Sequence, residues 1–407
     1  MDVKIGVIGA GNRGCRCFGR YISERDDARV VAFADPNPER AQGAAELLGI
    51  EVNIYPDTEG MLAGEALDGV VITSPDHTHE ACAMAAIDKG LHILIDKPLA
   101  STTAGCVNVI RAARKRGVEV FVGFNMRHVP LLRRIKEVID AGEIGNLMVM
   151  ETREFYDGGR SYMCRWNRRR EWSGGLWVHK GCHDFDVQNW FNSGGEPVRV
   201  SAFAGINALR PDAVPFEVEP EQPVGPNCTV CAYREQCPDM YPVESRLWSD
   251  ETAAVDGYHK DLCMYTSDKD THDNGVAIVE YDNNVRASLL ECFIANFSDR
   301  LYTITGDRGT IMAAVKTPTQ FEVRPRWGEE NRIIEVPPAA AGGHGGSDPR
   351  LVESFVDSIR TGAPYESNLV DGIRAVAMGE AAELSWRDHR MVELSELVDL
   401  NDPSLAG

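Results

Sequence analysis

The sequence predicts a two-domain α/β protein in which a doubly wound parallel sheet is followed by an α+β domain with a large open, mainly antiparallel sheet. Three observations support this fold class. A glycine-rich turn follows the first apolar run, apolar runs then alternate with helical patterns to about residue 125, and short strands joined by turns begin near residue 275. A chain of 407 residues is also too long for one typical core, so we place the domains at 1–125 and 126–407.

The first element is a short apolar strand over residues 3–8. It leads into the turn Gly9-Ala10-Gly11-Asn12-Arg13-Gly14, which a helix over 15–22 and a second strand over 29–34 follow. That strand ends at Asp35. A strand, a glycine turn, a helix and a strand ending in an acid are typical of a Rossmann domain that binds a dinucleotide. The turn residues expected at the cofactor are Gly9, Gly11, Asn12, Arg13 and Gly14.

The residue types of this turn fit a pyrophosphate at the positive end of a helix. Gly9 permits the tight turn, Gly11 lets the backbone approach the pyrophosphate, and Gly14 lets the helix pack on the strand. Asp35 is suited to accept hydrogen bonds from both adenosine ribose hydroxyls, and its charge repels a 2′-phosphate. We therefore predict NAD as the cofactor, with NADP as the less favoured alternative because Arg40 could serve a 2′-phosphate.

Strands and helices continue to alternate up to residue 125. We predict strands over 69–73, 91–95 and 119–123, with helices over 79–89 and 104–116. Ligands of doubly wound sheets bind at the carboxyl ends of the strands. The polar residues at these ends are therefore site candidates, namely Thr73, Lys97 and Asn125.

The composition argues against several classes of partner. A net charge of −20 opposes binding to nucleic acid or to an anionic membrane, both of which require clustered Lys and Arg. No stretch approaches the roughly 20 apolar residues that cross a bilayer. Because no signal peptide precedes the first strand, we expect a cytoplasmic protein whose eleven cysteines are reduced thiols available to metal.

Three features together resemble the glucose–fructose oxidoreductase/inositol dehydrogenase/MocA (Gfo/Idh/MocA) family. They are the glycine turn with Asp35, the strand end Asp96-Lys97-Pro98, and the run Gly181-Cys182-His183-Asp184 that follows a Gly-Gly turn. The resemblance covers nearly the whole chain and is most specific in the nucleotide half. A cysteine-containing insertion at about 207–275 is its least typical part.

The resemblance implies roles for the ends of the Rossmann strands. Lys97 takes the place of the family lysine that contacts both substrate and nicotinamide ribose, and Asp96 replaces the usual glutamate before it. Asn125 and Arg127 occupy the edge between cofactor and substrate, where Arg127 is expected to contact substrate. The family segment near the cofactor matches Thr73, Ser74, Pro75 and His79.

By the same resemblance, His183 is the catalytic histidine. Many family members carry an aspartate four residues earlier, but here that position is His179, followed by Lys180. Residues four apart share one side of a helix, so both histidines are candidates for acid–base chemistry, for which a side chain with a pKa near 7 is well suited. Lys97 is an alternative base if burial lowers its pKa. We also expect Asp184 to contact substrate.

The segment before the Gly-Gly turn is dense in aromatic and hydrogen-bonding side chains. Aromatic faces with bidentate donors suit a hydroxylated ring, although an exposed arginine-rich loop or a subunit contact is the alternative. The residues expected to bind a sugar are Tyr162, Arg165, Trp166, Asn167 and Arg168.

Four cysteines in the insertion form a candidate structural zinc site. Cys228 and Cys231 have the spacing of a zinc knuckle, and Cys237 and Cys263 follow. His259 or His272 could replace the fourth ligand, and scattered free thiols are the alternative. A metal would stabilise a long irregular insertion.

From residue 275 the pattern becomes that of an open sheet. We predict strands over 276–281, 286–293, 301–305 and 310–314, helices over 351–360 and 371–387, and an exposed loop over 337–346. The family resemblance implies that such a sheet covers substrate on one face and packs subunits on the other, so we expect a homodimer or homotetramer.

The sequence therefore predicts an NAD-dependent oxidoreductase that moves hydride between nicotinamide and a secondary alcohol or ketone of a sugar, glycoside or polyol. Two alternatives stay open. One is a glycosidase or epimerase that oxidises its sugar transiently with tightly held NAD. The other is a non-catalytic NAD-binding sensor, against which the presence of both Lys97 and His183 argues.

Overall fold

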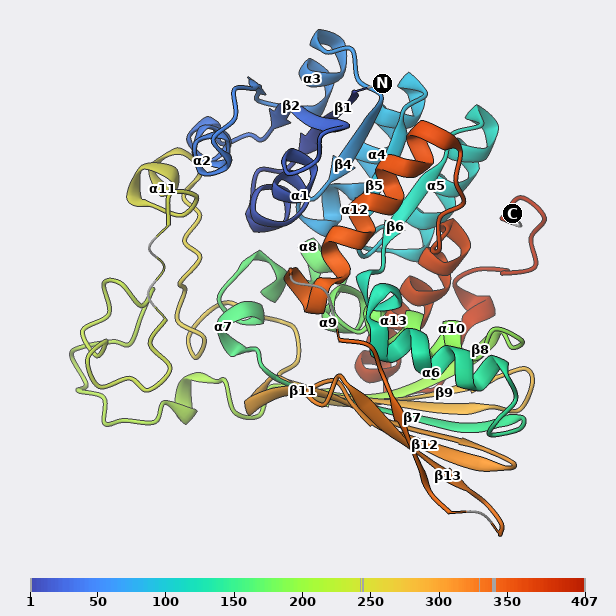
Figure 1. The fold of residues 1–407 in the computed structure, drawn as a ribbon. Helices are drawn as coiled ribbons and strands as arrows, with labels where there is room; N and C mark the ends of the chain where they lie inside the picture. The colour runs from blue at the N-terminus through green and yellow to red at the C-terminus, as the bar shows by residue number, and fades with distance from the viewer. Residues whose placement is uncertain (1, 242, 244, 329, 339–341, 406–407) are drawn as a thin grey trace.

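The computed structural model describes residues 2–241, 243, 245–328, 330–338 and 342–405. It contains two sheets, a six-stranded one built by the N-terminal part of the chain and a nine-stranded one below it in Figure 1. The insertion extends to one side as a long irregular segment, drawn in yellow-green. No helix in the described part of the chain is long and apolar enough to span a bilayer.

The six-stranded sheet is entirely parallel and has the order β3-β2-β1-β4-β5-β6, which confirms the doubly wound fold. The strand order reverses between β1 and β4, where ligands of such sheets bind. The short strand β3 was not predicted. The strands are β1 (Val3–Ile8), β2 (Ala28–Ala34), β3 (Asn53–Tyr55), β4 (Gly69–Ile72), β5 (His92–Asp96) and β6 (Val120–Gly123).

Helices cover both faces of this sheet. The glycine turn leads into a π-helical segment, Arg13–Gly19, that continues as α1 (Arg20–Ser23). On the same face lie α2 (Pro38–Leu48) and, from the far end of the chain, α12 (Gly343–Thr361). The opposite face carries α3 (Thr58–Gly64), α4 (His79–Lys89) and α5 (Thr103–Arg116).

Helix α12 joins the N-terminal core although it lies in the C-terminal part of the chain. Its Leu351, Val352 and Phe355 pack in one buried cluster with Phe18 and Leu94. The helix begins at Gly343, so residues 343–346 of the predicted loop are helical instead, while residues 339–341 lie outside the described residues. The domain boundary at residue 125 stays a prediction.

The nine-stranded sheet has the order β14-β13-β12-β11-β7-β10-β9-β8-β15. Only the β7–β10 pair is parallel, so the sheet is mainly antiparallel, as predicted. Strands β9, β10, β11 and β12 correspond to the predicted ones. The strands are β7 (Leu147–Asp157), β8 (Pro197–Gly205), β9 (Asn274–Tyr281), β10 (Arg286–Cys292), β11 (Ile294–Gly306), β12 (Gly309–Ala314), β13 (Gln320–Pro325), β14 (Arg332–Glu335) and β15 (Val392–Glu393).

The inner face of this sheet packs against helices that separate it from the parallel sheet. Alternate residues of β9 are buried, and its inward Ala277 and Val279 share the main core with Val187 and Val376. These last two residues lie on α10 (Cys182–Phe191) and α13 (Leu369–Asp388). The remaining helices here are α6 (Pro130–Asp140), α7 (Gly159–Tyr162), α8 (Arg170–Ser173) and α9 (Leu176–His179).

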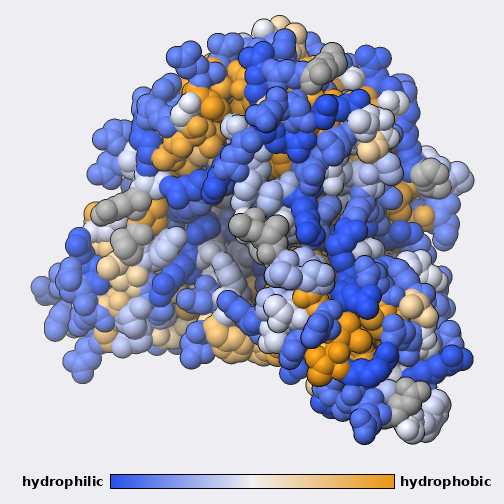
Figure 2. Space-filling view, in the orientation of Figure 1, coloured by the Kyte–Doolittle hydropathy of each residue, from blue (hydrophilic) through white to orange (hydrophobic). Residues whose placement is uncertain are grey.

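The insertion lies between β8 and β9 and returns to the parallel sheet. Its helix α11 (Asp250–Asp256) lies beside α2. There the Asn37 side chain donates to the carbonyl oxygen of Thr252 at 2.8 Å and to a carboxylate oxygen of Asp256 at 2.9 Å. The face of the molecule seen in Figure 2 is mostly hydrophilic, in keeping with the charge of the chain, and an orange patch lies over the nine-stranded sheet.

Candidate active site

Two adjoining cavities lie at the carboxyl ends of the parallel strands. One, of about 320 Å³, lies between these strand ends and the second half of the chain, and the other, of about 570 Å³, lies over β2 and β4. They share wall residues from both halves, including Gly11, Thr73 and Trp166. The predicted site residues that line the smaller cavity are Gly11, Asn12, Arg13, Thr73, Ser74, His79, Asp96, Lys97, Asn125, Tyr162, Arg165, Trp166, Asn167, His179 and His183. Those that line the larger one include Gly9, Asp35 and Pro75.

The glycine turn is shaped as the sequence predicts. Gly9 has φ +93°, and a Cβ there would lie 2.6 Å from the backbone nitrogen of Ser74. A Cβ on Gly14 would lie 1.9 Å from the carbonyl oxygen of Gly9, so the following helix packs directly on the turn. A Cβ on Gly11 would meet only the ring of Trp248, at 3.8 Å. Packing within the protein therefore leaves room at Gly11, where a pyrophosphate needs it, and the turn fits a dinucleotide.

Asp35 is held in place at the end of β2. Its carboxylate accepts backbone N–H groups from Ala10 and Asn37, both at 2.9 Å, and Arg40 lies 3.3 Å away. Burial raises the pKa of Asp35, while Arg40 and the two N–H groups oppose this shift. Arg40 also donates to Asp256 at 2.6 Å and lies over the ring of Trp248. Its guanidinium is thus already occupied.

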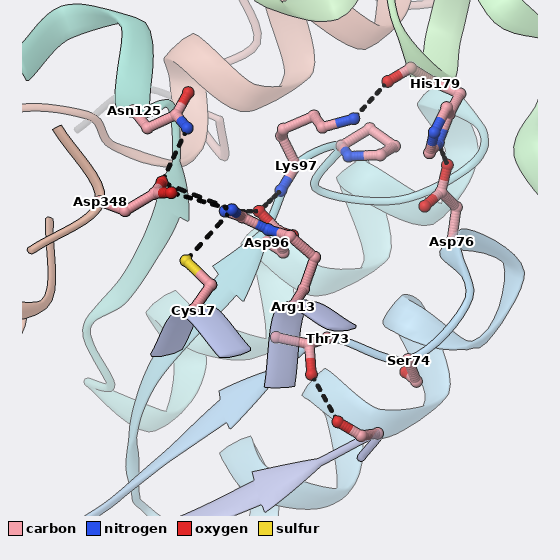
Figure 3. A network of polar contacts seen from close by, with 12 residues as sticks. Arg13, Cys17, Thr73, Ser74, Asp76, Asp96, Lys97, Asn125, His179 and Asp348 are labelled. Atoms are coloured by element: carbon pink, nitrogen blue, oxygen red, sulfur yellow. Dashed lines mark hydrogen bonds and ion pairs between the residues drawn. The ribbon is translucent and has the colours of Figure 1, made fainter. Parts of the chain in front are cut away.

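A network of charges fixes the ends of β1, β5 and β6 (Figure 3). Arg13 binds Asp96 through two hydrogen bonds of 2.7 and 3.1 Å and lies 3.4 Å from Asp348. Asn125 donates to the same Asp348 at 2.9 Å. Burial opposes ionisation of Asp96, but Arg13 outweighs it and lowers the pKa of this carboxyl. Asp348, from α12, was not predicted because it lies more than 200 residues away in sequence.

Lys97 and His179 meet across the cavity (Figure 3). The Lys97 ammonium donates to the carbonyl oxygen of His179 at 2.7 Å. The ring of His179 lies between Asp76, 2.6 Å from Nδ1, and the Asn167 amide, 3.1 Å from Nε2. Burial raises the pKa of Asp76 to about 7 and lowers that of His179 well below its ordinary value. With both ring nitrogens engaged, the geometry suits His179 better to holding Lys97 and Asn167 in place than to proton transfer.

His183 lies at the start of α10 and lines the same cavity with 8% of its surface exposed. Lys180 precedes it and also lines the cavity, although no site role was predicted for this lysine. Its ammonium lies 2.8 Å from Glu154 and above the rings of Tyr156 and Tyr162. The cavity wall therefore includes a second lysine, whose charge is balanced by a buried acid.

Behind this wall lies a buried group of acids, Glu154, Asp184 and Glu291, whose ligand atoms all lie within 4.8 Å of one another. Arg300 contacts both Glu154 and Asp184 at 2.9 Å, and Lys180 contacts Glu154. These two cations already bind Glu154 and Asp184, and His272 lies 3.0 Å from Glu291, so the group is a salt-bridge network and does not suit a metal ion. Burial raises the pKa of Asp184 to about 6 against the effect of Arg300. Asp184 does not line the cavity, contrary to its predicted contact with substrate.

Two predicted substrate contacts also point away from the cavity. Arg127 is buried and forms a bidentate pair with Asp186 at 2.6 and 2.9 Å. Arg168 donates to Asp268 at 2.6 Å and to the carbonyl oxygen of Arg165. Both guanidinium groups bind nearby acceptors of the chain itself, because burying a charge without a partner is costly. The neighbouring Tyr162, Arg165, Trp166 and Asn167 do line the cavity.

The four insertion cysteines do not form a metal cluster in the described residues. The acidic triad is the one set there in which three or more ligand atoms come within 4.8 Å of one another. The four thiols are free, and the amide of Gly225 donates to Cys231 at 3.4 Å. The predicted replacement ligand His272 lies elsewhere, 3.0 Å from Glu291. The structural zinc therefore stays a prediction.

The Gly-Gly turn before α9 places the histidine segment against α13. Gly174 and Gly175 have φ of +73° and +95°, and a Cβ on Gly175 would lie 2.0 Å from the carboxylate of Glu383. Glu383 accepts from Arg170 at 3.0 Å and from the backbone nitrogen of Trp177 at 3.3 Å. The close approach requires glycine, and Glu383 ties the start of α9 to the core.

We expect the stability contributed by Glu383 to fall as pH rises toward 7. Burial raises its pKa to about 7 despite Arg170, so below that pH the folded state retains a proton that the unfolded chain loses near its ordinary value of 4.5. This contribution to the free energy of unfolding is fully present below pH 4.5 and is lost as pH rises to 7. The total change is on the order of 3 kcal/mol. Glu383→Gln should flatten the fall in urea midpoint between pH 5 and 8, whereas exposed Glu335→Gln should not. An unchanged pH slope in Glu383→Gln would contradict this assignment.

Comparison with known proteins agrees with the architecture of the site. Residues 3–124 match the NAD-binding Rossmann domain of the Gfo/Idh/MocA oxidoreductase family, and residues 136–394 match the C-terminal α/β domain of that family. The chain is a member of the Gfo/Idh/MocA family. It is therefore an oxidoreductase with an NAD-binding domain, and the resemblance drawn from its motifs is confirmed.

Relatives of this Gfo/Idh/MocA protein differ in how much of the chain they match. YteT of Bacillus subtilis (strain 168) is 30% identical over 98% of this chain and 99% of its own. An inositol 2-dehydrogenase/D-chiro-inositol 3-dehydrogenase of Halalkalibacterium halodurans is 32% identical over 47% of this chain and 53% of its own. Levoglucosan dehydrogenase, solved with NADH and levoglucosan, has the same fold, with a TM-score of 0.73 and 20% identity over 97% of this chain and 100% of its own.

Several cavity residues of this Gfo/Idh/MocA chain were not predicted. Asp76 directly follows the segment that the family resemblance placed at the cofactor, so its position alone could have indicated it. The insertion residues Trp248, Tyr258 and Lys260 also line the smaller cavity. Nothing in their local sequence marks them, because the long insertion brings them back to the parallel sheet only through its docking on α2.

Proposed function

We propose that the protein is an NAD-dependent dehydrogenase that acts on a secondary alcohol, or the corresponding ketone, of a sugar, glycoside or polyol. The observation that carries the proposal is Lys97 at the end of β5. Its ammonium enters a cavity bounded by the glycine turn on one side and by His183 on the other. The substrate class is supported by two similar proteins: a relative that matches about half of this chain is an inositol dehydrogenase, and a protein of this fold was solved with NADH and levoglucosan.

In this proposal the cofactor and the cavity residues have distinct roles. Bound nicotinamide supplies the hydride acceptor or donor. Lys97 and His183 take or return the proton of the reacting hydroxyl, and His179 keeps Lys97 oriented through its carbonyl oxygen. The aromatic faces of Tyr162 and Trp166 pack against the CH groups of the ring.

A screen of polyols, sugars and glycosides, followed by NADH absorbance at 340 nm, tests this function. We expect steady NADH formation with at least one polyol or sugar. Glycosidic or epimerised product without net NADH would instead support transient oxidation by retained cofactor. NAD binding with no turnover of any substrate would support a sensor.

We propose that NAD is preferred over NADP, because Asp35 lines the larger cavity and Arg40 is held by Asp35 and Asp256. Asp35→Ser is expected to weaken NADH binding about tenfold or more, because it removes a charged acceptor. It should also reduce the difference in affinity between NADH and NADPH. Fluorescence titration of both cofactors measures this. A variant that folds normally and keeps the wild-type preference would contradict the role of Asp35.

We further propose a homodimer or homotetramer formed through the outer face of the nine-stranded sheet. Val149, Phe203 and Ile278 project from β7, β8 and β9 on that face and are 48%, 75% and 54% exposed. The double variant Phe203→Asp with Ile278→Asp is expected to lower the solution mass, measured by light scattering, toward the 44.8 kDa of one chain. Val218→Asp, in the insertion, is the matched control. An unchanged mass in the double variant would place the interface elsewhere.

The structural zinc is likewise a proposal that rests on the spacing of the four insertion cysteines. Elemental analysis of the purified protein is expected to find zinc in the wild type and less of it after Cys228→Ser. Wild-type protein without zinc would refute it.

A further inference from the structure

The insertion provides a wall of the cofactor channel. The Trp248 indole N–H donates to the Asn12 side chain at 3.2 Å, and its ring faces Gly11. The same ring lies 4.7 Å from the guanidinium carbon of Arg40. With α11 anchored to α2, the insertion thus lies directly over the turn on which a dinucleotide would rest.

Lys260 lies over the ring of Trp248. Its ammonium is 4.9 Å from the centre of the Trp248 ring, only 8% of the residue is exposed, and it lines the smaller cavity together with Gly11 and Asn12. Burial, together with the positive charges of Arg165 and Arg16, lowers the pKa of Lys260 to about 7. A buried ammonium among other cations is unfavourable unless an anion joins it.

The cations of this cavity differ in how they are balanced. Arg13 is paired with Asp96, and Lys180 with Glu154. Among the described residues, no carboxylate lies within 4.0 Å of the charged groups of Lys260 or Arg165, and the one hydrogen bond of the Arg165 side chain, to the Tyr241 hydroxyl, is 3.5 Å long. The part of the cavity next to the glycine turn therefore has two cations that no acid of the described chain neutralises.

We infer that Lys260 and Arg165 form an anion subsite that binds the pyrophosphate of the dinucleotide from the side opposite the glycine turn, with Trp248 covering it. A substrate carboxylate has the same chemistry as a ligand. The position favours the pyrophosphate, because Trp248 joins Lys260 to Asn12, whereas Lys97 and His179 mark the reacting end of the cavity. The inference rests on the proposed function in so far as it requires a dinucleotide in this channel.

Calorimetric titration with ADP-ribose and with adenosine tests the subsite, because only ADP-ribose carries the pyrophosphate. Lys260→Met is expected to weaken ADP-ribose binding about tenfold to a hundredfold and to leave adenosine binding unchanged. Lys260→Arg, which keeps the charge, should stay within a few-fold of wild type. Lys316→Met, which removes an exposed lysine far along the chain, is the matched control, and thermal unfolding verifies that each variant folds.

The outcomes separate this inference from the proposed function. Wild-type protein that does not bind ADP-ribose would refute the dinucleotide channel and the subsite together. Wild-type binding that is equally tight in folded Lys260→Met would overturn the subsite alone. The subsite is also overturned if Lys260→Met binds ADP-ribose as tightly as wild type but has a higher KM for galacturonate and an unchanged KM for neutral sugars. The Lys260 charge would then bind a substrate carboxylate. If Lys260→Met does not fold, Lys260→Arg and Arg165→Met decide the question. Equal ADP-ribose binding by Lys260→Arg and wild type, with weaker ADP-ribose binding by Arg165→Met, supports the inference. Unchanged ADP-ribose binding by Arg165→Met overturns it.

Discussion

Replacement of Lys97 by methionine is expected to lower kcat by about a hundredfold to ten-thousandfold, the range over which a positioned acid or base accelerates proton transfer. Methionine keeps most of the side-chain volume but removes the ammonium that donates to the His179 carbonyl oxygen. Because we propose that this ammonium acts at the reacting end of the cavity, the loss should fall on kcat more than on cofactor affinity. Stopped-flow and steady-state NADH absorbance with a substrate from the screen measure it.

Two companion variants make the result specific. Lys97→Arg restores a positive charge, but a guanidinium does not give up its proton in proteins, so this variant should stay nearly as slow as Lys97→Met. Lys89→Met removes an exposed lysine at the end of α4 and should keep wild-type turnover. Full activity of Lys97→Met, or recovery by Lys97→Arg, would show that the ammonium does not transfer the proton.

Replacement of Arg300 by methionine is expected to destabilise the protein by about 3–5 kcal/mol, the usual loss when one partner of a buried ion pair is removed. Arg300 contacts Glu154 and Asp184, which are 2% and 0% exposed, and only Lys180 would remain to balance them. Urea unfolding followed by circular dichroism gives the change.

The matched control is Arg324→Met. Arg324 pairs with Glu322 at 2.7 Å on the exposed edge of the same sheet, and an exposed pair contributes at most about 1 kcal/mol. A similar, small loss in both variants would mean that the acids behind the cavity share protons and do not depend on Arg300. A larger loss in Arg300→Met identifies the guanidinium as the group that keeps them charged.

Much of the fold could be predicted because the strands that matter are buried on both faces. β1, β4, β5 and β6 are short, mainly apolar runs that end at recognisable motifs. β3 was missed because it has three residues and is only half-buried. β7 was missed for another reason: charged residues such as Glu151 and Arg153 hide its alternation, and Glu154 is buried there only through its pairing with Arg300 and Lys180.

The residues of the candidate site were likewise predicted only in part. Residues at strand ends and beside the glycine turn were found, because a parallel sheet places its carboxyl ends together whatever the rest of the chain does. Trp248 and Lys260 were not found, since only the return of the insertion brings them to the cavity, and Asp348 was not found, since only the return of α12 brings it to Arg13 and Asn125. Arg127 and Arg168 were expected at the substrate, but a sequence does not reveal which arginine already has a carboxylate to bind.

The return of α12 has a consequence for any attempt to use the nucleotide half by itself. A fragment ending at residue 125 would lose Leu351, Val352, Phe355 and Val356, and would uncover the apolar side chains beneath them, among them Phe18 and Leu94. It would also lose Asp348, the carboxylate that Arg13 and Asn125 share. Such a truncated piece is expected to aggregate, and grafting this nucleotide module onto another enzyme would require carrying the distant helix along with it.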